Sequence, residues 1–475
     1  MTPINIAQKR EVFWDNFLLD EEKTTAFHRS FNLTEKEVCT VLNQGKELES
    51  VSWLQVLKLP DGGYRMYYCP WSQWDKEIVI RLAVLESSDG LSWTRPSLNL
   101  FPHPELKENN IVIDHLIDNA YVFYDTNPNC PEDEKFKAVC SDKAVSKDTG
   151  YDSCLICYTS QDGLNFKKGW VLSETGTFDT LNTVHFRDGK YYAYIRDYHG
   201  FVPGKRESTG IRDIRVMTSE DFHTWTIPEE LEYDDGLDYP MYTNNIHPYE
   251  RAPQIRIGFP VRYYDRGEWT PNTAQFGSAP IKEDVMKMEA RYGIAVTDCV
   301  FIHSRDVNGK KWSRSGEAFM TPGYETDENW MYGDCYLASN MIDSGKETYY
   351  MYCDKSCRTR GKGKEIIRYE IRKDGFACIM AGGEEKVAVT KPIVFEGKEL
   401  HLNFETSAFG HIFVDVLDEN GDEIPGKTSF EIYGNTIDRK VFLKDETDFS
   451  ALSGKTVRLR FRMKDAKLYS IKFED

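Results

Sequence analysis

The chain has 475 residues, and its 59 Lys and Arg against 77 Asp and Glu give a formal net charge of −18. Binding to nucleic acid or to anionic lipid needs a cationic surface, so the composition argues against both partners. Hydrophobic residues make up 40% of the chain and aromatic residues 13%, which indicates a folded, β-rich protein that can stack flat rings against a ligand.

Neither a membrane span nor a disulfide framework is expected. No stretch approaches the roughly 20 apolar residues that a transmembrane helix needs. The N-terminal residues lack the apolar segment of a signal peptide, and the 11 Cys are odd in number and scattered along the chain. We therefore expect reduced thiols and a cytoplasmic location.

A short turn motif recurs four times along the chain. A small polar residue precedes Asp, a turn follows, and an aromatic residue comes last: SSDGLSW (87–93), TSQDGLNF (159–166), TSEDFHTW (218–225) and, more loosely, SRDVNGKKW (304–312). The Asp side chain can accept backbone N–H groups within the turn, Gly can adopt a positive φ, and the aromatic ring can cover the next strand.

Strands rich in aromatic residues form a second repeat. A turn and an alternating strand occur together in DGGYRMYY (61–68), DGKYYAYI (188–195) and SGKETYYMYC (344–353), and segments 136–140 and 255–263 occupy the same place with other turns. The two repeats define five units of three or four strands, about 60–90 residues apart, and this spacing predicts a five-bladed β-propeller. An irregular array of β-sandwiches is the alternative.

Helical signals are weak throughout, the best being residues 281–293 in a loop of the fourth unit, and the repeats end near residue 372. From residue 376 onward short apolar strands alternate with tight turns, and Asn420-Gly421 is a strong turn signal. The pattern predicts an all-β fold of two domains, a propeller over residues 1–375 and a C-terminal β-sandwich over residues 376–475. Because no Gly/Ser-rich linker separates them, we expect the two domains to pack together.

Acidic residues recur just before the first strand of the predicted units, at Glu49, Asp118, Asp179 and Asp334. The innermost strand of each propeller blade lines the axis, so polar groups at its start converge on one pocket. Each acid alone is more simply a solvated loop carboxylate. Four like charges at one opening, however, cost stability unless a function uses them.

Paired carboxylates in a cleft are what cleavage of a glycosidic bond requires. One protonates the leaving oxygen, and the other attacks the anomeric carbon or activates water. We expect Glu49 and Asp179 to form this pair, with Asp334 as the third candidate. The residues expected to bind a sugar are Asp118, Asn119, Trp53, Asn182, Arg196, Tyr242, Asn244, Arg262 and Trp330. Packing between blades is the alternative role for the aromatic residues.

At these residues a resemblance appears. The repeated turns, the five units and the trailing sandwich resemble the five-bladed glycoside hydrolases of families 32, 43, 68 and 130. Four segments more closely resemble bacterial family-32-like proteins: WDNFLLD (14–20), NNIV (109–112), FDTLNTVHF (178–186) and the ending LSGKTVRLRFRMKDAKLYSIKF (452–473). The resemblance implies hydrolysis of an oligosaccharide or a glycan side chain. The W-M-N-D-P-N-G and E-C motifs of family 32 are absent, and its R-D-P element matches only as Arg196-Asp197-Tyr198.

Two other functions stay open at this point. A phosphorylase or lyase would act on similar sugars, and phosphorolysis would need Arg196, Arg212 and Arg262 to converge on phosphate. A propeller can also bind a carbohydrate without catalysis. No P-loop, dinucleotide or zinc-protease motif occurs, so no cofactor is expected, although the acids named above could hold a structural Ca²⁺ ion on the axis. The expected partner is a carbohydrate substrate, and the sequence does not indicate an oligomeric state.

Overall fold

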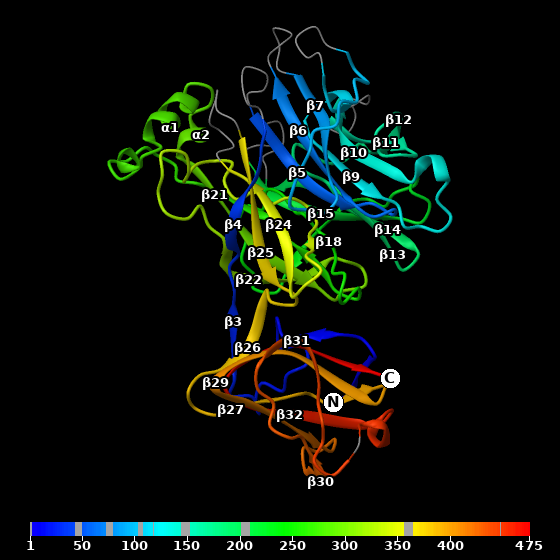
Figure 1. Cartoon of the computed structure of the whole chain (residues 1–475). Coiled ribbons are helices and arrows are strands. Elements are labelled where there is room, and N and C mark those ends of the chain that lie inside the picture. Colours follow the sequence, from blue (N-terminus) through cyan, green and yellow to red (C-terminus); the bar gives the residue numbers. More distant parts are fainter. Residues whose placement is uncertain are drawn as a thin grey trace.

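The computed structural model shows two all-β bodies, one above the other in Figure 1. All ten cysteines in the described ranges are free thiols, as the sequence predicts. Within the same ranges, no helix has the length and apolar character that crossing a bilayer requires. The described residues are 2–42, 50–72, 79–102, 108–116, 118–143, 153–200, 210–355, 364–446 and 448–475.

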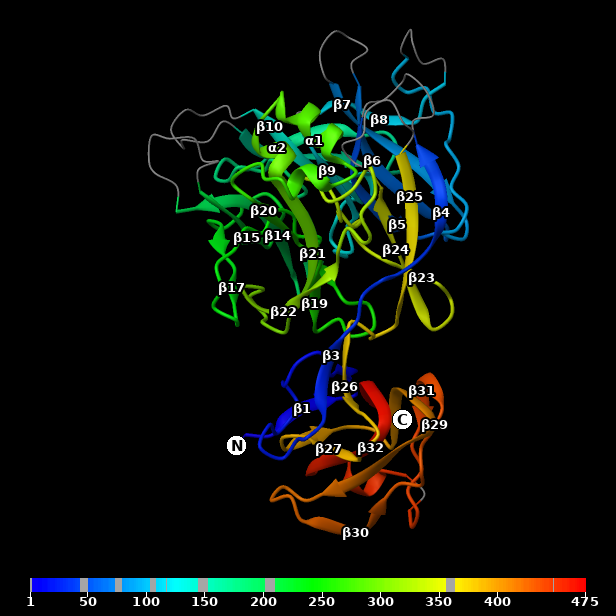
Figure 2. The ribbon, with the colours of Figure 1, turned by 90° about the vertical axis from the view of Figure 1, so that its left-hand side faces the viewer.

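Five sheets form the larger body and confirm the predicted five-bladed propeller (Figures 1 and 2). The first three blades are antiparallel meanders of four consecutive strands. Blade I contains β5 (Ser50–Lys58), β6 (Tyr64–Ser72), β7 (Val79–Ser87) and β8 (Ile111–Leu116). Blade II contains β9 (Ala120–Tyr124), β10 (Phe136–Lys143), β11 (Ser153–Ser160) and β12 (Lys167–Ser173). Blade III contains β13 (Thr183–Arg187), β14 (Lys190–His199), β15 (Ile211–Ser219) and β16 (Glu229–Glu230).

Blade IV consists of six consecutive short and long strands, whereas blade V takes one strand from near the start of the chain. Blade IV contains β17 (Glu232–Tyr233), β18 (His247–Pro248), β19 (Arg256–Gly258), β20 (Val261–Asp265), β21 (Ala295–Ser304) and β22 (Lys311–Met320). Blade V contains β23 (Ile342–Asp343), β24 (Thr348–Asp354), β25 (Lys364–Arg372) and β4 (Thr34–Leu42). Because β4 pairs with β25, the start of the chain closes the propeller ring.

The recurrent turn motif has the structure that its sequence predicts. Asp162 Oδ1 accepts the backbone N–H groups of Leu164 and Asn165 at 2.8 Å each, and Gly163 has a φ of +72°. These hydrogen bonds outweigh the effect of partial burial and lower the pKa of Asp162 to about 2. The same contacts recur at Asp89 and Asp221, so the motif fixes how the fourth strand returns in blades I to III.

Buried amide and hydroxyl side chains join the inner edge of each blade to the next. Gln55 of blade I, for example, donates to the Ala120 carbonyl of blade II at 2.8 Å and accepts from Val122 N at 2.5 Å. The ring closes where the Ser339 backbone exchanges two hydrogen bonds with β5. The side chains of this hydrogen-bond ring are Gln55, Asn119, Asn182, Thr183, Asn244, Asn245 and Ser339. They supply partners for backbone groups that the irregular inner strands would otherwise leave buried and unsatisfied.

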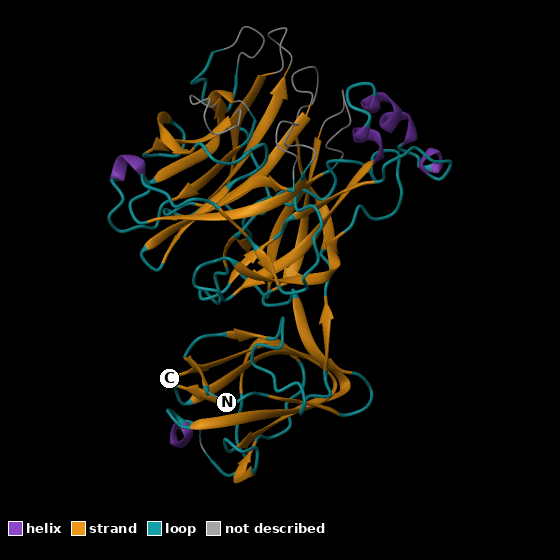
Figure 3. Ribbon diagram, turned by 180° about the vertical axis from the view of Figure 1, so that it is seen from behind, coloured by secondary structure: helices purple, strands orange, loops and turns teal. Residues whose placement is uncertain are grey.

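The helical segment of the fourth unit is present as two short helices, α1 (Ala279–Met286) and α2 (Arg291–Ile294), between β20 and β21. Both lie at the end of the propeller that is far from the smaller body (Figures 1 and 3). Tyr292 of α2 stacks on Tyr332, with ring centroids 5.2 Å apart. The insertion therefore reaches residues that lead into blade V.

Two 19-residue strands, β29 (Glu399–Leu417) and β32 (Thr456–Glu474), pair along their length and organise the smaller body. A register shift between Thr406 and His411 divides the pair into two halves. The flanking strands are β26 (Ala377–Ala381), β27 (Lys386–Val389), β28 (Ile393–Phe395), β30 (Glu423–Thr428) and β31 (Asn435–Lys440). Their apolar faces enclose one core that includes Phe404 and Phe461, as the predicted β-sandwich requires.

The N-terminal strands belong to the sandwich and not to the propeller. β1 (Ile4–Ala7) pairs with β28, β2 (Glu11–Val12) with β32, and β3 (Phe27–Ser30) with β26. This pairing differs from the boundary expected from the sequence, which placed residues 1–375 in the propeller. Local patterning shows that a strand exists but does not show which distant strand it pairs with.

The chain crosses between the two bodies twice, and the crossings lie side by side. β3 leads into β4, and β25 leads back into β26, which pairs with β3 (Figure 2). Asp374 lies between β25 and β26 and is 0% exposed. Its carboxylate contacts residues of both bodies: Arg10, Tyr249, Arg251, Asn403 and Ser470. The two bodies therefore pack against each other around one buried charge.

Candidate active site

The four acidic residues predicted to meet at the axis have different positions. Glu49 lies outside the described residues. Asp118 and Asp179 share one neighbourhood, because both carboxylates add to the effect of burial and raise the pKa of the Tyr242 hydroxyl. Asp334 lines a separate crevice.

Residues from blades I, III and IV and from segments that connect successive strands meet in what we call the axial cluster. Tyr242 is at its centre, since the ring centroids of Trp53, Tyr263, Tyr332 and Tyr336 lie 6.0–6.3 Å from that of Tyr242. The Tyr332 hydroxyl also donates a hydrogen bond to the Tyr242 hydroxyl at 3.0 Å. The members of the cluster are Trp53, Asp118, Asp179, Arg196, Tyr198, Arg212, Tyr242, Tyr263, Tyr332 and Tyr336. Because its members come from three blades and from the segments that precede β9, β13, β18 and β23, this cluster lies where the blades converge.

The carboxylate of Asp179 is part of the axial cluster and is accessible to solvent. Its Oδ1 lies 3.2 Å from Nε of Arg196, and its side chain is 42% exposed while that of Arg196 is 0% exposed. Asn182 Oδ1 accepts the backbone N–H of Arg196 at 2.9 Å, and Arg196 Nη1 donates to the Asp197 carbonyl. The guanidinium carbon lies 4.0 Å from the centroid of the Tyr198 ring. A firmly held guanidinium thus orients an accessible carboxylate beside aromatic rings.

Three residues predicted to bind sugar belong instead to the hydrogen-bond ring. Asn119, Asn182 and Asn244 are fully buried. Asn182 donates to the carbonyls of Phe178 and Thr180 at 3.1 and 2.8 Å, in addition to accepting from Arg196 N. Because both ends of the amide are engaged with backbone, Asn182 supports Arg196 and is a positioning residue.

We expect Asn182→Leu to destabilise the whole fold. The change leaves buried backbone groups without partners at about 1–3 kcal/mol each, so the free energy of unfolding should fall by about 3 kcal/mol. Urea denaturation measures this loss. As a control, the same change at exposed Asn129 should alter stability by less than about 0.5 kcal/mol. Equal stability of the two variants would contradict the structural role of Asn182.

Asp334 lines a crevice of about 260 Å³ between blades IV and V, together with Asp354. Its carboxylate accepts the N–H of Met331 at 2.8 Å, and the residue is 8% exposed. Burial, reinforced by the charge of Asp354, raises the pKa of Asp334 to about 7 against hydrogen bonds from the backbone. Among the described residues, no hydrogen bond or ion pair connects Asp334 to Asp179.

The raised pKa of Asp334 predicts that stability falls as pH rises. The folded pKa of about 7 exceeds the usual value of 3.8, so the folded state holds the proton more tightly between these two pH values. Ionisation across that window should cost about 4 kcal/mol of unfolding free energy. Asp334→Asn should remove this cost, and its stability advantage over the wild type should grow from pH 4 to pH 8 in urea denaturation. Parallel pH profiles for the two proteins would contradict the prediction.

Arg262 and Trp330, also predicted to bind sugar, meet in a second cavity of about 340 Å³ that Tyr263 lines as well. Arg262 Nε donates to Asp298 Oδ1 at 2.7 Å, so its charge is already paired. Trp330 Nε1 donates to the Gly323 carbonyl at 2.9 Å. Arg262 therefore does not join Arg196 in the way that the phosphorylase alternative requires, although the cavity adjoins the axial cluster through Tyr263.

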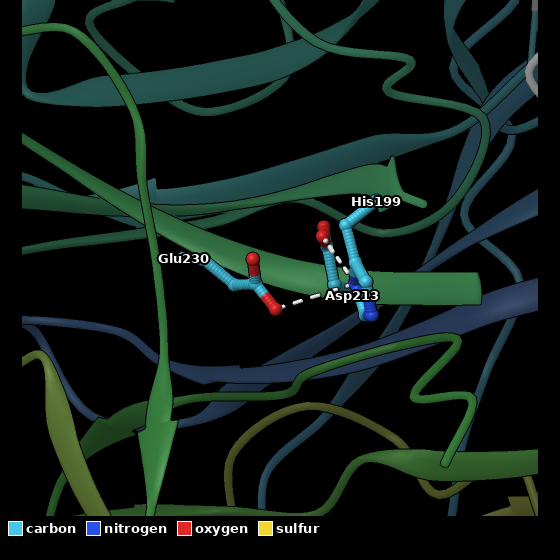
Figure 4. A group of neighbouring side chains, drawn as sticks. All are labelled: His199, Asp213 and Glu230. Carbon is cyan, nitrogen blue, oxygen red and sulfur yellow. Dashed lines mark hydrogen bonds and ion pairs between the residues drawn. The ribbon is translucent and has the colours of Figure 1, made fainter. Parts of the chain in front are cut away.

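A separate group on blade III has ligand types that could hold a metal ion. His199 Nδ1 lies 3.0 Å from Asp213 Oδ2 and 3.2 Å from Glu230 Oε1 (Figure 4), and His199 Nε2 lies 3.0 Å from Asp238 Oδ2. Burial would lower the pKa of His199, but the hydrogen bonds that its ring donates to Asp238 and Asp213 outweigh burial and raise the pKa. A protonated imidazole then satisfies the carboxylates as an ion-pair cluster. Because the three residues lie on three strands, no sequence motif indicates the group.

Two arginines near the axis carry no clear signal in the sequence. Arg212 faces Tyr198 across the β14–β15 pair, and its guanidinium carbon lies 3.9 Å from the centroid of the Tyr263 ring. Arg291 lies in the short helix α2, where its charge acts on Tyr198, Tyr263 and Tyr332. The sequence suggested Arg212 only for phosphorolysis. Arg291 comes from an insertion whose contacts no repeat predicts.

Comparisons with known proteins find similarity in structure alone. No protein-family model matches the sequence, and no curated protein is significantly similar to it. An N-acetylgalactosamine deacetylase from F. plautii is 11% identical with a TM-score of 0.44, over 74% of this chain and 96% of that one. The α-L-arabinofuranosidase Arb93A from Fusarium graminearum is 11% identical with a TM-score of 0.43, over 72% and 98%.

An α-L-arabinanase from Penicillium chrysogenum is 12% identical with a TM-score of 0.37, over 76% of this chain and 94% of that one. At these values the likenesses carry no argument about the reaction, and the fold assignment rests on the strand pairing described above. Membership of family 32 or 43 is not confirmed by any of these comparisons.

Proposed function

We propose that the protein cleaves glycosidic bonds, with the axial cluster as its active site. The observation that carries this proposal is the accessible Asp179 carboxylate, fixed by buried Arg196 beside the rings of Tyr198 and Tyr242. Aromatic faces stack on sugar rings, and a carboxylate is the group that glycoside hydrolysis uses as nucleophile, base or acid. The net charge of −18 argues against nucleic-acid binding as an alternative role.

The roles within the site follow from these positions. Asp179 attacks the anomeric carbon or activates the water that does so, since Arg196 holds its carboxylate in one orientation. Asp118, which shares the neighbourhood of Tyr242, binds a hydroxyl of the substrate. Glu49 immediately precedes β5 and is our candidate for the second carboxylate, which protonates the leaving oxygen.

Phosphorolysis is the second candidate, and one observation favours it. Arg196 and Arg212 both lie against Tyr198 and Tyr242, with guanidinium carbons 4.0–5.6 Å from the ring centroids. Two guanidinium groups in one place suit a phosphate that replaces water as the nucleophile. Phosphorolysis would use Arg262 as a third phosphate ligand, but the charge of Arg262 is already paired with Asp298.

A panel of aryl glycosides and oligosaccharides, assayed with and without inorganic phosphate, tests the proposal. Hydrolysis that needs no phosphate supports a glycosidase. Release of sugar phosphate only when phosphate is added supports phosphorolysis. Saturable binding of a glycan without any cleavage would instead identify a carbohydrate-binding propeller and overturn the enzymatic assignment.

A further inference from the structure

We infer that the substrate is an acidic sugar whose carboxylate binds a subsite made by Arg196, Arg212 and Arg291. This inference rests on the proposed function, because it names the substrate class of the same site. It does not depend on which carboxylate performs the cleavage. The contacts of each arginine and the hydrogen-bond donors around them carry the argument.

Arg212 is a buried cation without an anion. The residue is 7% exposed, and among the described residues no carboxylate lies within 4.0 Å of its guanidinium and no hydrogen bond reaches it. Its guanidinium carbon lies against aromatic faces, 3.9 Å from the ring centroid of Tyr263 and 5.6 Å from those of Tyr198 and Tyr242. A buried charge is costly unless it is paired, so a site that keeps one unpaired is prepared for an anionic ligand.

Arg196 has hydrogen-bonding capacity left over beside Arg212. Its Nε pairs with Asp179, and its Nη1 donates to the Asp197 carbonyl, but Nη2 is buried without a hydrogen-bond partner in the described part of the chain. Both guanidinium groups lie against Tyr198, so the free donors of the two side chains share one neighbourhood.

Arg291 adds a third positive charge from helix α2. Its guanidinium carbon is 5.5 Å from the centroid of the Tyr292 ring, and Tyr292 in turn stacks on Tyr332 with ring centroids 5.2 Å apart. It is half-buried, and no ion pair joins it to a described carboxylate. Helix α2 thus adds a cation to the same group of tyrosines that surrounds Arg212.

Other donors in the cluster also lack acceptors. Nε1 of Trp53 and the Tyr263 hydroxyl are buried, and neither has a hydrogen-bond partner in the described ranges. A neutral sugar hydroxyl both donates and accepts, whereas a carboxylate only accepts and offers about four lone-pair positions. The surplus of donors therefore matches an oxyanion better than a neutral hydroxyl.

The planar fork of a guanidinium fits the two oxygens of a carboxylate, and charge-assisted pairs of this kind are among the stronger hydrogen bonds in proteins. A sulfate or a free phosphate shares this chemistry, so the test must separate the sources. The aromatic rings around Tyr242 provide the stacking surface for the sugar ring that carries the charge.

Isothermal titration calorimetry of the full chain tests the subsite without relying on cleavage. The probes are glucuronic acid, galacturonic acid and N-acetylneuraminic acid, each beside a neutral counterpart (glucose, galactose and N-acetylmannosamine), with glucose 6-sulfate and inorganic phosphate as further arms. We expect at least one carboxylic acid to bind about tenfold or more tightly than its counterpart. Arg212→Gln and Arg291→Gln should each reduce that affinity about tenfold. Arg439→Gln, which changes an exposed arginine of the sandwich, should leave it unchanged.

Each outcome decides the inference. Equal binding of acid and neutral sugars, a preference that survives both arginine changes, or binding of phosphate or sulfate in place of any carboxylate would overturn it. If Arg212→Gln does not fold, Arg291→Gln on the half-buried helix gives the answer. Acid-selective binding without cleavage of any glycan would support the subsite and reject the glycosidase proposal. Cleavage of neutral glycans without acid selectivity would support the glycosidase proposal and reject the subsite.

Discussion

Asp179→Asn should lower kcat on a glycan that the wild type cleaves by about 1,000-fold or more while leaving the fold intact. The amide keeps the shape of the carboxylate but cannot act as nucleophile or base, and groups in these roles contribute roughly 10²–10⁴-fold. Because the change leaves buried Arg196 without its ion-pair partner, the thermal unfolding midpoint should also fall, and the assay temperature must stay below it. Steady-state kinetics and a thermal melt on the same preparation measure both quantities.

The matched control is Asp334→Asn, the same substitution at another acid of the sequence-predicted set. It lies in the crevice between blades IV and V, so the variant should retain most of its activity. Full activity in Asp179→Asn together with loss in Asp334→Asn would reject the axial site and move the chemistry to the crevice. Loss in both variants would reject the separation of the two sites.

Asp374→Asn should cost about 3–5 kcal/mol of unfolding free energy, the largest stability effect expected from one isosteric change. Oδ1 of Asp374 accepts hydrogen bonds from Tyr249 at 2.6 Å and Arg251 at 2.9 Å, and Oδ2 accepts one from Ser470 at 2.6 Å. Arg10 adds a second positive charge 3.6 Å from Oδ2. Without the carboxylate, Arg10 and Arg251 lose the one carboxylate that lies within 4.0 Å of them among the described residues.

Chemical denaturation of the full chain measures this loss, and Asp188→Asn is the control. Asp188 is an exposed turn residue with a φ of +51°, which Asn accepts readily, so its change should stay within about 0.5 kcal/mol. A separate early transition for the sandwich in Asp374→Asn would show that the junction had been weakened selectively. Identical denaturation curves for Asp374→Asn and the wild type would refute the role of Asp374 as the central charge.

The carboxylate of Asp374 also makes the stability of the fold depend on pH in the acid range. Burial alone would raise the pKa of Asp374, but Arg251 and Arg10 outweigh it and the pKa is lowered. The pKa of Asp374 is lower in the folded state than in the unfolded state. Its contribution to the free energy of unfolding is therefore fully present above the ordinary pKa of 3.8 and is lost as the pH falls through the folded pKa. The wild type should therefore lose stability more steeply than Asp374→Asn below about pH 4.

The blades could be predicted because short-range sequence patterns mark the strands and turns of each one. The turn at Asp162 needs only its own neighbours, and an alternating strand such as 188–195 needs a core on one side. Both are short-range signals, so their recurrence was enough to count the units. The candidate carboxylate at Asp179 followed from the same regularity, since a repeated position maps to a repeated place around the axis.

Long-range pairing explains what the sequence could not give. Residues 4–30 carry ordinary strand patterns, and nothing in them indicates partners in β26, β28 and β32. From the sequence, the amide of Asn182 could bind a sugar or the backbone. Its contacts in the folded protein show that it bonds to the backbone within the hydrogen-bond ring. Arg291 lies outside the repeats, so its approach to the axis depends on how the insertion folds back.

The pairing of β4 with β25 has a consequence for biosynthesis. The first segments to leave the ribosome, β1 to β4, find their partners only among residues 364–474. Until these partners are made they remain unpaired edges, and closing so long a loop carries an entropic cost that near-neighbour contacts do not share. The propeller ring can close once β25 has been made, whereas β2 has to wait for β32, so the edge of β2 stays unpaired until translation is almost finished.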